Sequence, residues 1–125
     1  LDLYDQTLKS NYLFKAKELC KKTIELFYVK EKSIFQKNIV ATSDLFHNPI
    51  DISDGNIPNG NSVMLLNFSR LKMKIEATKL SNSLNGYLNI YKSLMASALK
   101  SIDYFNMTYT NKNCTDEGCL IEKKD

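Results

Sequence analysis

The stretch Asp54-Gly-Asn-Ile-Pro-Asn-Gly-Asn-Ser62 decides the fold of this chain, because it separates irregular sequence from the helical sequence that follows. We call residues 54–62 the bend. Its two glycines allow positive φ angles, and its proline disfavours a helical conformation for the residue before it. Asn61 or Ser62 can then cap the first amides of a helix. Polar bends at helix N-termini often bind small anionic or hydroxylated ligands, so the bend is either a ligand-binding loop or a plain connector.

Helical periodicity lies on both sides of the bend. Apolar residues recur there at spacings of three and four, with polar residues between them, which is the pattern of amphipathic helices. Gly86 weakens this pattern in one segment. Methionine and aromatic residues on the apolar faces are expected to form a core. The sequence predicts four helices, at residues 12–28, from 62 to about 73, from 75 to about 87 and from about 91 to 105.

The segment at residues 29–61 lacks helical periodicity. Its apolar residues come in short pairs, such as Ile34 with Phe35, separated by polar residues. Irregular segments of this length are uncommon inside compact domains, and they usually carry function or pack as short strands. We therefore expect a mainly α protein with one long irregular segment and a short strand or hairpin near residues 33–40.

Charge and hydropathy argue against two classes of partner. The 17 basic residues against 14 acidic ones give a net charge of +3, which is too mild to indicate a nucleic-acid partner. Arg70 is the one arginine, and lysine lacks the planar fork that binds phosphates and base edges. No run approaches the roughly 20 consecutive apolar residues that span a bilayer. The sequence therefore predicts neither nucleic-acid binding nor a membrane span.

The three cysteines do not fit a secreted disulfide scaffold, which usually carries an even number at high density. We therefore expect a reducing compartment and a cytoplasmic protein. Cys20 lies among apolar residues of a predicted helix, where burial is expected. Cys114 and Cys119 lie in a polar tail, where they suit either a local disulfide or half of a metal site. The one histidine, His47, is distant in sequence, so we predict no metal and no cofactor.

Three motifs together resemble one known family. Residues 51–71, Asp51-Ile-Ser-Asp-Gly-Asn-Ile-Pro-Asn-Gly-Asn-Ser-Val-Met-Leu-Leu-Asn-Phe-Ser-Arg-Leu71, resemble its signature DG-x-x-P-S-G-N-S … N-L-x-R-L. The family is that of thioredoxin-domain proteins related to spermatogenesis-associated protein 20, also called DUF255. The apolar pattern of residues 3–27 is similar to its upstream helix, and the four-residue spacing of Cys114 and Cys119 is similar to its C-terminus. The resemblance covers nearly the whole chain, but only the C-terminal third or so of a family member.

This resemblance implies a partial (α/α) toroid of helical hairpins, similar to six-hairpin glycosidases and epimerase-like folds. Residues 1–106 would form its last hairpins, and residues 107–125 a polar tail with the two cysteines. A fragment or reduced homologue of this kind lacks the thioredoxin-like domain, and no Cys-x-x-Cys occurs here. Hairpins in a ring bury faces against both neighbours. We therefore expect the partners to be the missing hairpins of a full-length protein, or a second copy of the chain.

In such toroids the ligand lies in a central funnel lined by loops, and the bend would be one wall of that funnel. Asp54 would act as acid, base or hydroxyl acceptor, while Asn59, Asn61 and Ser62 would contact a small sugar-like ligand. These four residues are the candidate site.

A glycosidase mechanism needs a second carboxylate, and Asp51 and Asp44 are the nearby candidates, with His47 as another base. The alternative is a noncatalytic structural or protein-interaction module. In that case Asp54 would hold backbone amides, and Asn61 with Ser62 would be the N-cap pair. The sequence leaves both functions open.

Overall fold

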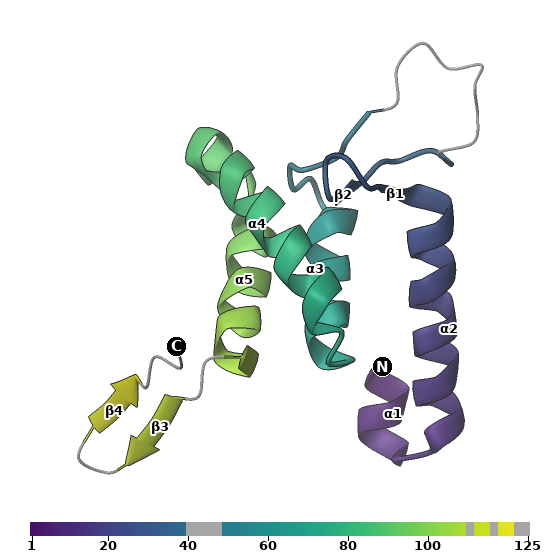
Figure 1. Ribbon diagram of the computed structural model, residues 1–125, viewed down its shortest axis with the longest axis vertical. Helices are drawn as coiled ribbons and strands as arrows, with labels where there is room; N and C mark the ends of the chain where they lie inside the picture. The colour runs from purple at the N-terminus through teal and green to yellow at the C-terminus, as the bar shows by residue number, and fades with distance from the viewer. Residues whose placement is uncertain (40–48, 110–111, 116–117, 122–125) are drawn as a thin grey trace.

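The computed structural model describes residues 1–39, 49–109, 112–115 and 118–121, and it is mainly helical as expected (Figure 1). In chain order the elements are α1 (Asp2–Thr7), α2 (Ser10–Phe27), β1 (Tyr28–Val29), β2 (Ile34–Phe35), α3 (Gly60–Arg70), α4 (Lys74–Tyr91), the 3-10 turn η1 (Lys92–Leu94), α5 (Ala96–Tyr109), β3 (Lys112–Thr115) and β4 (Gly118–Ile121).

The helix α1 is a short element that the apolar spacing does not predict as a separate helix. It ends at Leu8, whose φ of 55° is left-handed and whose N–H donates to the Tyr4 carbonyl over 2.7 Å. This conformation reverses the chain, so that α1 packs against α2. Arg70 at the end of α3 holds α1 in place, because its Nη2 lies 2.8 Å from Asp2 Oδ1 and 2.7 Å from Asp5 Oδ2.

The predicted hairpin near residues 33–40 is present, but it lies earlier in the chain. Its first strand is β1, which continues directly from α2, and it pairs antiparallel with β2 in the register Tyr28 to Phe35 and Val29 to Ile34. Within residues 33–39 only β2 is a strand. The shift has a packing reason, because Ile34 and Phe35 are buried in the core and Ser33 closes the turn with a φ of 52°.

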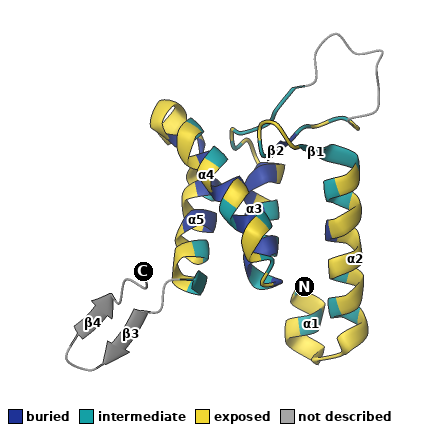
Figure 2. Cartoon of the chain, in the orientation of Figure 1, coloured by how far each residue is buried: buried dark blue, intermediate teal, exposed yellow. Residues whose placement is uncertain are grey.

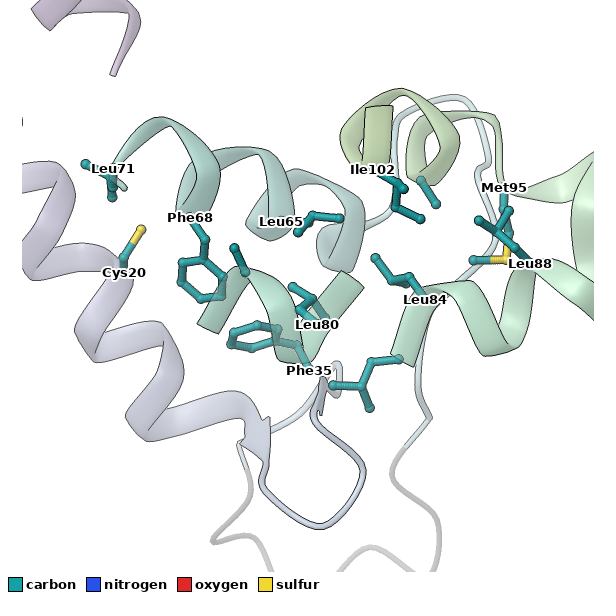
Figure 3. Packing of buried hydrophobic residues seen from close by; sticks show 13 residues of the cluster. Cys20, Phe35, Leu65, Phe68, Leu71, Leu80, Leu84, Leu88, Met95 and Ile102 are labelled. Atoms are coloured by element: carbon teal, nitrogen blue, oxygen red, sulfur yellow. The ribbon is translucent and has the colours of Figure 1, made fainter. Parts of the chain in front are cut away.

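The main core lies where α3 packs against α4 and α5 (Figure 3). Phe68 of α3 is fully buried, and its ring centroid lies 5.9 Å from that of Phe35. Figure 2 shows the burial concentrated on α3, α4 and α5, whereas α2 is exposed over much of its length. Cys20 is the buried residue of α2. Among the residues whose burial the structure describes, the fully buried hydrophobic side chains are Ile34, Leu65, Phe68, Ala77, Leu80, Leu84, Met95 and Ala98.

The end of α4, both ends of α5 and the tail differ from the sequence expectation. The helix α4 continues through the exposed Gly86, because Leu84 and Leu88 on either side of it are buried in the core. The helix α5 begins at Ala96 rather than near residue 91, since residues 92–94 form η1. It also ends later than 105, at Tyr109. Strands β3 and β4 then pair antiparallel, where no regular structure is expected.

Candidate functional site

The carboxylate of Asp54 connects the bend to the start of α5. Its Oδ1 accepts hydrogen bonds from the Asn59 backbone N (3.0 Å), from Asn59 Nδ2 (2.9 Å) and from the Ser97 hydroxyl. Its Oδ2 accepts from the Ser97 backbone N over 2.7 Å. The Asp54 backbone N–H in turn donates to the Leu94 carbonyl over 2.7 Å. Both carboxylate oxygens are therefore engaged by groups of the chain itself.

The same contacts determine the charge state of Asp54. Burial on its own raises the pKa of this carboxyl, but the hydrogen bonds from Ser97 and Asn59 outweigh that effect and hold its pKa below the usual range. Ser97 lies in the first turn of α5, where a negative charge also interacts favourably with the helix dipole. Asp54 is therefore ionised at neutral pH, which suits an anchoring group better than a general acid.

Asn59 is the N-cap of α3. Its Oδ1 accepts from the Ser62 backbone N over 3.0 Å, and its backbone is extended, with φ −68° and ψ 152°. The prediction that Asn61 or Ser62 caps this helix is therefore wrong. The reason is that a cap side chain bonds an amide two or three residues later, and α3 already begins at Gly60. Asn59 Nδ2 also donates to the Ile52 carbonyl over 3.1 Å, so the side chain holds the bend on both sides.

Asn61 connects α3 to the hairpin of β1 and β2. Its Oδ1 accepts from the Phe35 N–H over 2.8 Å, and its Nδ2 donates to the Phe35 carbonyl over 2.9 Å. The amide thus makes the pair of bonds that a neighbouring strand would make. Nδ2 also donates to the Asp51 carbonyl over 3.0 Å. Asn61 is only 2% exposed, so its polar atoms are satisfied inside the protein.

Ser62 is fully buried, and its Oγ has no hydrogen-bond partner among the described residues. Of the candidate carboxylates, Asp51 pairs with Lys37, with its Oδ2 3.2 Å from Lys37 Nζ. Asp44 and His47 lie outside the described residues. The structure therefore brings Asp54, Asn59 and Asn61 together around the start of α3, mainly through bonds to backbone groups.

Ser97 is the partner that sequence reasoning misses. It lies 43 residues from Asp54 in the chain, and no local pattern connects the two positions. A serine two residues after the buried Met95, at the start of an apolar-periodic run, is the available signal. That signal indicates a helix start, but it does not identify Asp54 as the acceptor.

Surface depressions lie beside the bend and along α2. The one beside the bend has about 110 Å³ and is lined by residues 35–37 with Asp51, Gly60 and Asn61. This is below the roughly 300 to 1,000 Å³ of typical small-molecule pockets. A groove of about 200 Å³ lies between α2 and α3, lined mainly by apolar side chains that include Leu19 and Met64. A wider one of about 490 Å³ lies at the end of α2, where Lys21, Ile24, Glu25, Tyr28, Val29, Lys30 and Glu31 form its wall.

Comparison with known proteins gave no match to a family model, to a curated protein or to a solved structure. Among the described residues no group of three or more potential metal ligands comes together. No helix in the described part of the chain is both long and apolar enough to cross a bilayer.

Proposed function

We propose that this chain is a noncatalytic helical module that packs against other helical hairpins, and that the bend is its internal connector. The observation that carries the proposal is the geometry of Asp54, whose two carboxylate oxygens accept four hydrogen bonds from Asn59 and Ser97. A carboxylate with this many hydrogen bonds has few acceptor sites left for a substrate, and its lowered pKa makes it a weak base and an unsuitable general acid at neutral pH. In this proposal the bend joins α3 to α5.

The surroundings of α2 support a role in packing. Grooves flank this helix on the α3 side and at its C-terminal end, so it is only partly covered by the rest of the chain. Four large apolar side chains of α1, α2 and the turn between them are exposed, namely Leu3 (60%), Leu8 (77%), Phe14 (71%) and Leu19 (56%). Exposed apolar surface beside unfilled grooves is characteristic of protein interfaces. We infer that a further helical hairpin covers α1 and α2.

The partner we propose is a hairpin of the same kind, as in the (α/α) toroid, similar to six-hairpin folds, that the sequence resemblance to the DUF255 family implies. Such hairpins present apolar stripes of similar width, and each buries one face against its predecessor and one against its successor. Without those neighbours, the α1–α2 surface of one copy would pack against a second copy. The proposal therefore concerns an interface, and the bend contributes to it by fixing the helices that carry it.

The carbohydrate-binding alternative is tested by titration with neutral mono- and disaccharides, monitored through the backbone amide resonances of the bend. The connector proposal expects no saturable shift at Asp54, Asn59 or Asn61. Glycerol at matched concentration controls for bulk solvent effects. Saturable shifts confined to these amides would overturn the connector proposal and would establish a sugar-binding site at the bend.

A further inference from the structure

The hairpin of β3 and β4 places two cysteine positions opposite each other. Its register pairs Lys112 with Ile121, Asn113 with Leu120, Cys114 with Cys119 and Thr115 with Gly118. The hairpin follows α5 closely in the chain, and Figure 1 draws it beyond the end of that helix. The two cysteines therefore occupy directly paired positions on β3 and β4, and only four residues separate them in the sequence.

This backbone spacing suits a disulfide. Residues directly opposite in antiparallel strands have Cα atoms about 4.5 or 5.5 Å apart, depending on the hydrogen-bond pattern. Both values fall within the roughly 4.4 to 6.8 Å range of disulfide-linked cysteines. We propose that Cys114 and Cys119 form a reversible intramolecular disulfide that locks the β3–β4 hairpin.

The reaction we propose is exchange with a low-molecular-weight disulfide such as oxidised glutathione. The thiolate of one cysteine attacks the glutathione disulfide, forming a mixed disulfide and releasing one glutathione thiolate. The second cysteine thiolate then attacks the mixed disulfide, forming the Cys114–Cys119 bond and releasing the second glutathione. The two cysteines are oxidised, one glutathione disulfide is reduced to two thiols, and the two cysteine protons pass to the released thiolates.

Cys20 provides an internal comparison. It is only 6% exposed and lies in the core cluster. Burial raises the pKa of its thiol, which keeps it protonated and unreactive in the folded protein. Exchange is therefore expected at the two hairpin cysteines and not at Cys20.

The consequence would be a redox-dependent hairpin. An isolated two-stranded hairpin is marginally stable in water, and β3 and β4 form a sheet of two strands. A cross-strand disulfide restricts the open state and so favours the paired one. Oxidation would therefore favour the paired state of β3 and β4, and reduction would weaken this pairing while the helices remain folded.

The test equilibrates the full chain in glutathione buffers of graded potential, quenches it with acid, and counts free thiols by alkylation after denaturation. The expected result is three free thiols under reducing conditions and one, Cys20, under oxidising conditions, with a mass lower by two hydrogens. The single variants Cys114→Ser and Cys119→Ser should instead accumulate a mixed disulfide with glutathione. Helical circular dichroism of every variant checks that α1 to α5 stay folded.

The register is tested by moving one cysteine a single position, in the double variant Cys119→Ser with Leu120→Cys. A one-residue shift changes the sequence separation of the two cysteines little, but it moves the second cysteine to the position paired with Asn113 instead of the one paired with Cys114. The equilibrium constant for disulfide formation should fall by roughly tenfold or more. Three free thiols at every potential, mixed or intermolecular disulfides in the wild type, or an unchanged constant in the shifted variant would each overturn the proposal.

Discussion

The ionised carboxylate of Asp54 contributes to stability because it accepts hydrogen bonds from the Ser97 and Asn59 backbone amides. Replacement by asparagine removes the charge and presents an NH₂ group to at least one of these donors. We expect Asp54→Asn to lower the free energy of unfolding by roughly 1 to 3 kcal/mol. The exposed Asp103 on α5 provides the matched control, and Asp103→Asn should change the free energy of unfolding by less than about 0.5 kcal/mol. Urea denaturation of the two variants measures both values, and equal effects would contradict the anchoring role.

The pH dependence of this contribution follows from the direction of the pKa shift. The pKa of Asp54 is lower in the folded protein than in the unfolded chain, so near and below about pH 4 the unfolded state binds more protons. The contribution of Asp54 to stability is complete above the pKa of this carboxyl in the unfolded chain, and it is lost as pH falls through the pKa in the folded protein. The stability difference between wild type and Asp54→Asn should therefore be largest near neutral pH and shrink in acid. Denaturation series at several pH values check this, and a constant difference would exclude Asp54 as the source.

Substitutions of Asn61 test whether this position requires a side chain that both donates and accepts hydrogen bonds, or only a polar side chain. Asn61→Ala leaves the buried Phe35 N–H and carbonyl without their partner, which should cost roughly 2 to 4 kcal/mol. Asn61→Asp keeps the acceptor for the N–H but places a carboxylate against the Phe35 and Asp51 carbonyls. We therefore expect the aspartate variant to be at least as unstable at neutral pH and to recover in acid. Thermal unfolding at two pH values decides, and a stable aspartate variant would contradict the geometry.

At the scale of elements, Arg70 connects α1 to the end of α3. Its guanidinium reaches two carboxylates, but Asp2 and Asp5 are well exposed, so the global effect should stay below about 1 kcal/mol. Arg70→Lys should instead act locally, by raising the hydrogen-exchange rate of amides in α1. High salt should raise the same exchange rate in the wild type, because it screens the ion pairs of Arg70. Lys15→Ala, which breaks the exposed pair with Glu18, is the control and should leave α1 unchanged. Equal exchange in α1 for all three proteins would show that Arg70 does not hold it.

The helices could be predicted because their apolar spacing is local information. The buried positions Leu80, Leu84 and Leu88 lie four residues apart, and the exposed Gly86 between them does not interrupt the stripe. The start of α5 could not be predicted from the apolar spacing, because residues 92–94 form a 3-10 turn instead of helix. Leu94 in this turn is exposed, whereas Met95, directly before α5, is buried.

The contacts of the bend could be predicted only in part. A cap at its end is expected from its polar residues, but the choice of Asn59 over Asn61 depends on where the helix begins. Asn61 bonds to Phe35, 26 residues away, and Asp54 bonds to Ser97, 43 residues away. Contacts of this kind are fixed by the packing of α3 against its neighbours, which no local pattern records.

At the scale of the whole molecule, α3, α4 and α5 carry most of the buried core, although α4 and α5 also expose large apolar side chains such as Ile75 and Met107. By contrast, α1 has no buried residue and α2 has one, Cys20. The uneven burial is the reason to treat the α1–α2 surface as an interface. A single exposed leucine needs no explanation, but Leu8, Phe14 and Leu19 are all exposed on this one side of the molecule, and Leu19 also lines the apolar groove between α2 and α3. Polar substitution on this surface should therefore reduce association and leave the main core intact.

The most direct measurement is sedimentation velocity over a wide concentration range, applied to the wild type, to Phe14→Ser and to Ile90→Ser. Phe14 and Ile90 are similarly exposed, at 71% and 72%, but Ile90 lies on α4 near its C-terminal end. We predict a wild type that self-associates with rising concentration, a Phe14→Ser variant that shifts toward monomer with unchanged helicity, and an Ile90→Ser variant that behaves as wild type. A wild type that stays monomeric at every concentration, or equal effects of the two substitutions, would contradict the account.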